Sequence, residues 1–206
     1  MDLATFLQRA HDALDTPVLY WLGRGGHTAT EALPAAPGRA IHLKNELATL
    51  QRERPKVHQA YMAALAASEI DPATLPAVAC DCSGYVCWAL GVPRNGAVLA
   101  GGWINTDAMV ADAQRGQQLF VPLTRAVPGA LLVHPKPPGE DDGPGHVGIV
   151  TAVDADGRAT HMLHCAPDNI LLSPPAGLPR NAIAETDTAV FDRIASTRLV
   201  MWKAFV

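Results

Sequence analysis

Apolar residues near the start of the chain recur at the spacing of one helix face, which predicts an amphipathic helix over the first residues. The members of this face are Leu3, Phe6, Leu7, Ala10 and Leu14. Two more helices are expected over 42–54 and 56–70, on either side of Pro55. Between the first helix and these two, residues 16–40 are rich in glycine, proline and small side chains, which indicates a long surface loop.

After residue 117 the pattern changes to short β-prone runs separated by turn-rich linkers. The predicted strands are 118–123, 130–134, 146–153, 159–166 and 198–206. Helices in the first half and strands in the second predict an α+β domain, in which an antiparallel sheet packs against a helix.

The helix expected to cover this sheet is Ser83–Leu90. Asp81, Cys82 or Ser83 stands near its N-cap, and Gly91 follows its last apolar residue. This arrangement places Cys82 at a helix N-terminus, where free N–H groups and the helix dipole favour a thiolate. We therefore expect a Cys82 pKa below the usual thiol value. Ser83 and Gly84 are small enough to let a substrate approach the sulfur.

A cysteine nucleophile needs a base, and the base needs a group that orients it. His146 is the candidate base, because it stands at the start of an apolar strand. The orienting group depends on the turn that follows this strand. A three-residue turn with Gly157 in the left-handed position puts His164 on the face of His146, whereas an even-length turn selects His161 and Cys165 instead. Gly157 favours the first arrangement.

Three segments carry a family resemblance: Asp81–Val86 (DCSGYV), Gly145–Val150 (GHVGIV) and Leu163–Ala166 (LHCA). In order and spacing they resemble the NlpC-type cell-wall cysteine peptidases, which have a papain-like fold. The resemblance implies that Cys82 is the nucleophile, His146 the base and His164 the orienting residue. It further implies hydrolysis of an amide bond in peptidoglycan stem peptides or muropeptides, typically the bond from γ-D-glutamyl to the diamino acid, without a metal or an organic cofactor.

Two more stretches extend this resemblance. Residues 16–26 (TPVLYWLGRGG) look like the family segment whose tyrosine lies beside the nucleophile, and Tyr20 is the nearest match. The resemblance gives Tyr20 an oxyanion or substrate role, and it places Asp81 and Ser83 at the same substrate-binding edge, with Asp81 and Tyr20 holding a terminal amine. Residues 127–134 (VPGALLVH) resemble the usual Pro-Gly-Asp-Leu strand, although Ala130 replaces the aspartate.

Composition narrows the class of partner. The chain has 206 residues and a net charge of −4, so it has no basic surface for nucleic acid or an anionic membrane. Its length fits a single domain over residues 1–206. Residues 1–17 carry charge throughout and lack the apolar core of a secretory signal, so the expected location is the cytoplasm, with export by a non-classical route left open. The oligomeric state is left open.

Other interpretations stay open. The same triad would serve a thiol acyltransferase or another amide hydrolase, and the domain could be a non-catalytic binding module. Cysteine and histidine residues could also form a zinc site, although Cys-x-Cys followed by a helical cysteine fits the usual ligand spacing poorly. Cys87 lies on the apolar side of its predicted helix, which favours a core position, and Cys80 is either buried or part of a regulatory disulfide.

Overall fold

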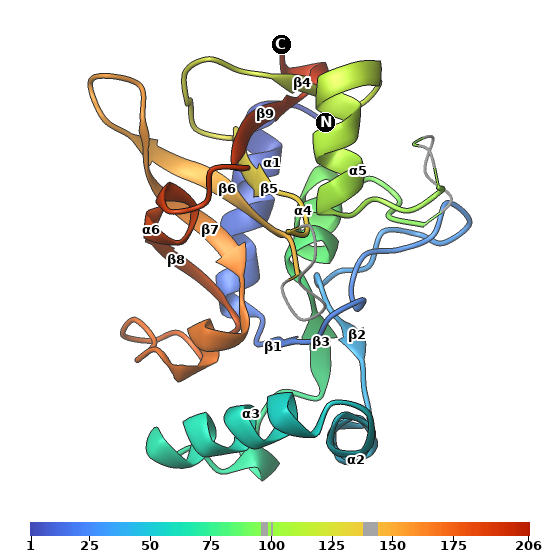
Figure 1. Ribbon diagram of the computed structural model, residues 1–206, viewed down its shortest axis with the longest axis vertical. Coiled ribbons are helices and arrows are strands. Elements are labelled where there is room, and N and C mark those ends of the chain that lie inside the picture. The colour runs from blue at the N-terminus through green and yellow to red at the C-terminus, as the bar shows by residue number, and fades with distance from the viewer. Residues whose placement is uncertain (96–98, 100, 138–143) are drawn as a thin grey trace.

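A computed structural model describes residues 1–95, 99, 101–137 and 144–206. Among these residues, six strands form the main sheet, with the order β4-β9-β5-β6-β7-β8 and antiparallel pairing throughout (Figure 1). The strands are β4 (Phe120–Pro122), β5 (Leu131–His134), β6 (His146–Val153), β7 (Ala159–Cys165), β8 (Ile183–Asp187) and β9 (Arg198–Trp202).

Two helices pack together beside this sheet: α1 (Leu3–Asp12) and α4 (Cys82–Leu90). All residues of α4 are buried, because α1 covers one side of it and strands β6 and β7 cover another. A helix enclosed on all sides is apolar around its whole circumference, which explains why its sequence shows little helical periodicity. On α1, the predicted apolar face contributes Phe6 and Ala10 to the same core.

A second, three-stranded sheet precedes α4 and leads into it. Strand β3 (Val78–Cys80) lies between β1 (Leu19–Tyr20), to which it is parallel, and β2 (Arg39–Ala40), to which it is antiparallel. Tyr20 is paired with Cys80 in this sheet. The pairing therefore brings the segment after β1 to the N-terminus of α4.

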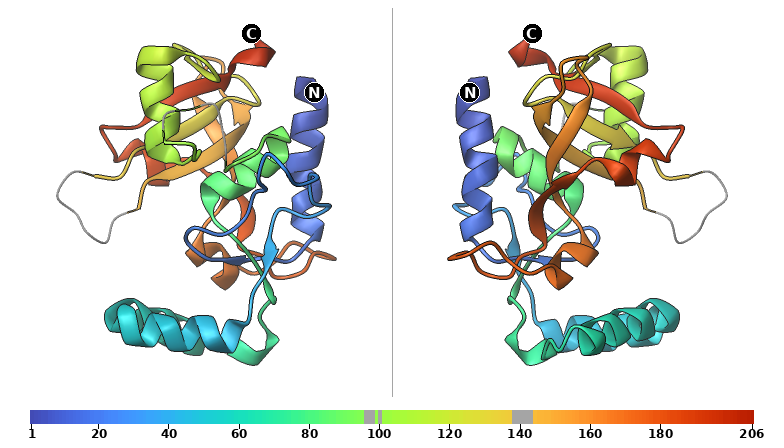
Figure 2. Two further views of the ribbon diagram at one scale, coloured as in Figure 1. Left: turned by 90° about the vertical axis from the view of Figure 1, so that its right-hand side faces the viewer. Right: turned by 90° about the vertical axis from the view of Figure 1, so that its left-hand side faces the viewer.

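Helices α2 (Leu43–Glu53) and α3 (Pro55–Ala67) form a hairpin at the end of the molecule opposite the two chain termini (Figure 2). Pro55 begins α3, where its missing N–H costs no helical hydrogen bond. The hairpin is anchored by a small apolar cluster that includes Leu65, Leu19 and Ile170.

Shorter elements complete the described chain. The α-helices are α5 (Thr106–Ala111) and α6 (Ala189–Asp192), the 3-10 turns are Ala13–Asp15, Pro72–Thr74, Pro167–Leu171 and Lys203–Phe205, and a π-turn covers Asp112–Gly116. No helix among the described residues has the length and apolar character that a membrane span requires.

The α+β, papain-like fold class predicted from the sequence is confirmed. The predicted long loop over 16–40 also contains β1 and β2, and β8 was not predicted. Strand β8 is at the sheet edge and buries only its first residue, Ile183, so its sequence lacks the apolar alternation of a half-buried strand.

Candidate active site

Helix α4 begins at Cys82, with Asp81 as its N-cap. The Cys82 sulfur lies 3.9 Å from the carbonyl oxygen of Gly145, and the backbone N–H of Val147 also interacts with it. The sulfur therefore contacts the backbone of the residue before His146 and of the residue after it. This contact brings the predicted nucleophile to the start of β6, where the predicted base stands.

The turn between β6 and β7 has the predicted odd length. The N–H of Asp154 donates to the carbonyl of Arg158 at 2.9 Å, and Gly157 adopts a left-handed φ of 75°. Strands β6 and β7 pair Ile149 with Leu163, and this register places the two histidines on one face. His161, the choice of the even-length turn, is an exposed residue on this strand.

Hydrogen bonds connect the two histidines to a threonine of β8. His146 Nε2 lies 2.7 Å from His164 Nδ1, and His164 Nε2 lies 3.0 Å from Thr186 Oγ1. The Thr186 hydroxyl donates its proton to the carbonyl of Asp187 at 2.9 Å. Thr186 Oγ1 must therefore accept a proton from His164 Nε2.

This chain of donors assigns the tautomer of each neutral imidazole. Because His164 carries its proton on Nε2, its Nδ1 accepts from the Nε2–H of His146. His146 then has no proton on Nδ1. A general base needs this unprotonated nitrogen. Thr186, which the sequence did not identify, sets the protonation state of that nitrogen through two hydrogen bonds, by way of His164.

Aromatic packing encloses the histidine pair. The ring of Phe191, from α6, stacks on His146 with centroids 5.4 Å apart and planes at 21°. It also meets His134 edge to face, and His134 is the cross-strand partner of His146 on β5. Burial lowers the pKa of His146 to about 3, with further lowering by His164 and His134, and burial lowers the pKa of His164 to about 4. Both imidazoles are neutral at physiological pH.

The thiol does not follow the sequence expectation of a lowered pKa. Burial raises the pKa of Cys82 to about 12, and the charge of Asp81 adds to the rise. The backbone N–H groups of Val147 and Ser83 and the charge of Arg94 act in the opposite direction without cancelling it. Desolvation of a buried sulfur thus outweighs the helix N-terminus. At rest the thiol of Cys82 and both imidazoles are neutral.

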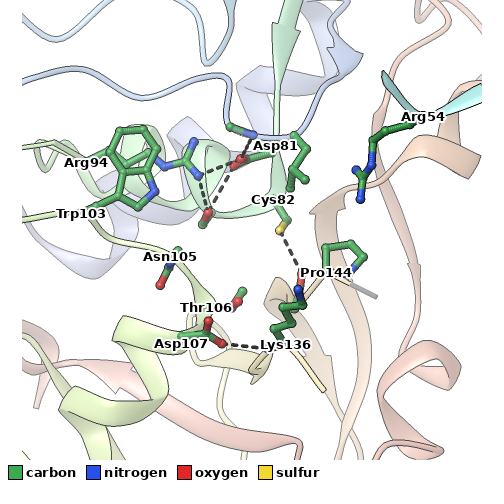
Figure 3. A pocket seen from close by; sticks show the side chains of 14 residues that line it. Arg54, Asp81, Cys82, Arg94, Trp103, Asn105, Thr106, Asp107, Lys136 and Pro144 are labelled. Carbon is green, nitrogen blue, oxygen red and sulfur yellow. Dashed lines mark hydrogen bonds and ion pairs between the residues drawn. The ribbon is translucent and has the colours of Figure 1, made fainter. Parts of the chain in front are cut away.

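Asp81 sits at the centre of a buried polar network (Figure 3). Its Oδ1 caps α4 by accepting the N–H of Gly84 at 2.7 Å, and it also accepts the hydroxyl of Ser83. Its Oδ2 accepts the N–H of Gly23 and pairs with Arg94, each at 2.7 Å. Arg94 also donates to the Ser83 hydroxyl at 2.8 Å. Asp81 and Ser83 border the open cavity, but their polar atoms are engaged with the protein.

Arg94 was not singled out in the sequence, because an arginine between a proline and an asparagine has no local signature. Its guanidinium carbon lies 4.4 Å from the ring centroid of Trp103, and it donates to the carbonyl of Arg24 at 2.8 Å. A side-chain carbon on Gly84 would lie 2.6 Å from that same carbonyl. Gly84 therefore makes room for the Arg24 backbone, and not for substrate as the sequence suggested.

Tyr20, the predicted oxyanion or substrate residue, lies close to the nucleophile. Burial raises its pKa well above the usual tyrosine value, and negative charge on Cys82 and Asp81 adds to the rise. Its hydroxyl therefore stays protonated and able to donate a hydrogen bond. Its side chain is partly buried and borders a cavity on the side of the α2–α3 hairpin.

An open cavity of about 350 Å³ borders the nucleophile. Its lining includes Cys82, Ser83 and Gly145 together with Trp103 and the start of α5. Figure 3 shows Cys82, Trp103 and Thr106 around this cavity. A second cavity of about 400 Å³ lies towards the hairpin, and the two share Leu22, Arg54 and Pro144 in their walls. The two cavities therefore adjoin one another, and the first of them borders the Cys82 sulfur.

All four cysteines are reduced and buried. Cys80 donates its thiol proton to the Asp81 carbonyl, and Cys165 donates to the Cys80 carbonyl. Within the described part of the chain, no group of three or more histidine, cysteine or acidic side chains is placed to hold a metal ion.

Residues 73–164 match the family model of the CHAP domain. CHAP domains are found in NlpC/P60-like cysteine peptidases and amidases of cell-wall hydrolases, so the resemblance stated from the sequence is confirmed. The match indicates a peptidoglycan-hydrolysing amidase or peptidase. No curated protein matches the chain.

The CHAP match runs from just before β3 to His164 and so contains Cys82 and His146 as well. It does not reach Thr186 or Phe191, and it begins after the α2–α3 hairpin. These parts of the site come from segments outside the matched CHAP domain.

The buried ion pair gives a first prediction. Arg94→Met leaves the Asp81 carboxylate uncompensated at 1% exposure, and we expect it to lower the free energy of unfolding by about 3–5 kcal/mol. Arg52→Met removes an exposed ion pair with Glu53 and should cost less than about 1 kcal/mol. Urea unfolding of both variants measures the difference. Equal, small losses would show that the buried pair contributes no more than a surface pair.

The proton chain gives a second prediction. Thr186→Val removes the acceptor for His164 Nε2–H at a cost of about 1 kcal/mol, which changes the tautomer ratio about fivefold. Nitrogen NMR of the imidazoles at pH 7.5 should show an unprotonated His146 Nδ1 in the native protein and a mixture in the variant. Thr186→Ser keeps the hydroxyl and should keep the native signal. An unchanged tautomer ratio in Thr186→Val contradicts the assignment.

The lowered histidine pKa values give a third prediction. The folded pKa of each imidazole lies below its unfolded value of 6.5, so the stability present above pH 6.5 is lost as the pH falls towards the folded values. By pH 5 the loss is roughly 2 kcal/mol per histidine. His164→Asn should reduce the difference between the unfolding free energies at pH 7.5 and pH 5 by about that amount. His161→Asn, at an exposed site, should leave it unchanged.

Proposed function

We propose that this protein is a cysteine amidase or peptidase that hydrolyses an amide bond in the peptide part of peptidoglycan or of muropeptides, with Cys82 as nucleophile. The observation that carries the proposal is the ordered chain Thr186–His164–His146, which leaves His146 Nδ1 unprotonated. It is joined by the contact of the Cys82 sulfur with the backbone of Gly145, the residue before His146. The CHAP match to residues 73–164 supports the class of substrate.

In the first half of the reaction, His146 Nδ1 takes the thiol proton as the Cys82 sulfur attacks the amide carbonyl. Because both groups are neutral before the attack, proton transfer and bond formation proceed together. The backbone N–H of Cys82 has no acceptor inside α4, since it is in the first turn, and it is free to donate to the developing oxyanion. The Tyr20 hydroxyl is our candidate for a second donor.

Collapse of the tetrahedral intermediate breaks the carbon–nitrogen bond. The proton on His146 Nδ1 passes to the leaving amine, and a thioacyl enzyme remains. Water then attacks the thioester with His146 again as base, and the product acid leaves with Cys82 restored as a thiol. The positive charge that forms transiently on His146 is shared with His164 through their hydrogen bond and lies over the ring face of Phe191.

The network around Asp81 supports a positioning role for Asp81 and Ser83. Their polar atoms hold the N-terminus of α4 and Arg94, so they fix the nucleophile and are not assigned to direct recognition of a substrate amine. For the scissile bond we propose the amide between γ-D-glutamyl and the diamino acid, on the family resemblance of the segments that contain Cys82, His146 and His164.

Defined muropeptides and mass spectrometry of the products test this function. Cys82→Ala and His146→Ala should abolish cleavage, and His164→Ala should lower kcat/KM by about 10²-fold or more, since it removes the group that orients the base. Cys87→Ala and His161→Ala are matched controls that should retain activity. Undiminished cleavage in Cys82→Ala or His146→Ala rules out the mechanism, and transfer of the acyl group to an added amine in place of water would identify an acyltransferase.

A further inference from the structure

The second cavity adjoins the cavity beside Cys82 and is lined largely by different elements. Its walls are the segment after β1 and one face each of α2 and α3. The hairpin ends before residue 73, where the CHAP match begins. The choice of ligand in this cavity therefore depends on hairpin residues that lie outside the CHAP match. The two cavities share Leu22, Arg54 and Pro144 in their linings, so they lie next to each other.

The face of helix α2 that lines this cavity is mostly polar. Glu46, Thr49, Leu50 and Glu53 line it at the i, i+3, i+4, i+7 spacing of one helix face, and no residue of α2 is buried. A helix face that packs only against protein is apolar. This face is mostly polar, which indicates that it meets solvent or a polar ligand.

The lining of this cavity also contains aromatic side chains. Tyr20, Trp21 and Tyr61 line it. The Tyr61 hydroxyl is buried and has no hydrogen-bond partner among the described residues, and burial raises its pKa to about 12, so it remains a donor. A buried hydroxyl without a partner costs free energy that a ligand with a polar edge would recover after a small adjustment of the side chain.

The charges of the α2 face are compensated within the protein. Glu46 pairs with Arg24, and Glu53 pairs with Arg52. The arginines already neutralise these two carboxylates, so the carboxylates do not favour a positively charged ligand. Their remaining lone pairs can still accept hydrogen bonds from a neutral ligand. A lining that combines aromatic rings with hydroxyl and carboxylate groups suits a molecule with an apolar face and a rim of hydroxyl groups. A pyranose ring has this chemistry, because its C–H bonds form the face and its hydroxyls form the rim.

We propose that this cavity binds an N-acetylhexosamine ring of the glycan to which the stem peptide is attached, so that the enzyme recognises sugar and peptide together. This inference rests on the proposed function, because the peptide arm of the same molecule would lie over Cys82. The cavity volume of about 400 Å³ accommodates a sugar ring and lies within the range of small-molecule sites.

Two substrates with the same stem peptide test the proposal, one with its disaccharide and one without. We expect kcat/KM to be about tenfold or more higher for the sugar-bearing substrate, as one or two good hydrogen bonds provide. Tyr61→Phe and Thr49→Val each remove one hydroxyl from the cavity and should bring the ratio of the two kcat/KM values towards one. Asn45→Ala, on α2 but outside the cavity wall, should leave the ratio and both rates unchanged.

The failure of this inference is distinguishable from failure of the proposed function. Equal kcat/KM values for the two substrates overturn the sugar site while cleavage still supports the function. A sugar preference that survives in both Tyr61→Phe and Thr49→Val also overturns it, because the sugar then binds elsewhere. If neither substrate is cleaved, an NMR titration with the peptide-free disaccharide decides: shifts at Thr49 and Tyr61 support the site, and their absence refutes it.

Discussion

The geometry of the candidate active site depends on the carboxylate of Asp81. A single buried side chain caps α4, binds the loop after β1 through Gly23 and compensates Arg94. Both members of the ion pair are almost fully removed from solvent, at 1% and 3% exposure, so neither charge is tolerable without the other. The position of Cys82, one residue along the chain, follows from this arrangement. The pair also explains why an aspartate precedes the nucleophile although it touches none of the reacting atoms in the mechanism we propose.

Burial decides the electrostatic state of the resting site. Helix N-termini stabilise thiolates at exposed positions, but here the sulfur and both imidazoles lie inside the protein, where every charged form loses hydration. The result is a neutral thiol and two neutral imidazoles, and Thr186 fixes the tautomer of His146 through His164. The resting site therefore contains no thiolate–imidazolium ion pair. In the mechanism that we propose, charge separates only when a substrate carbonyl accepts the electron pair of the sulfur.

The candidate site combines residues within the CHAP match with segments outside it. Residues 73–164 contribute the thiol and both histidines, whereas β8 and α6 supply the proton acceptor and the aromatic cover. The α2–α3 hairpin lines the second cavity. In the function that we propose, chemistry and sugar recognition are therefore built by different parts of the chain.

The sequence by itself determined the elements whose periodicity is local and the residues whose order is distinctive. It predicted a helix over Ser83–Leu90, which in the structure begins one residue earlier at Cys82. It also predicted most of the antiparallel strands and the turn at Gly157 that places His164 beside His146. It did not reveal β8, Thr186, Arg94 or the paired cavities, because each of these depends on contacts between segments far apart in the chain. It also gave the wrong direction for the Cys82 pKa. A helix N-terminus is visible in the sequence, but the loss of solvent around the sulfur exists only once the tertiary structure has closed over it.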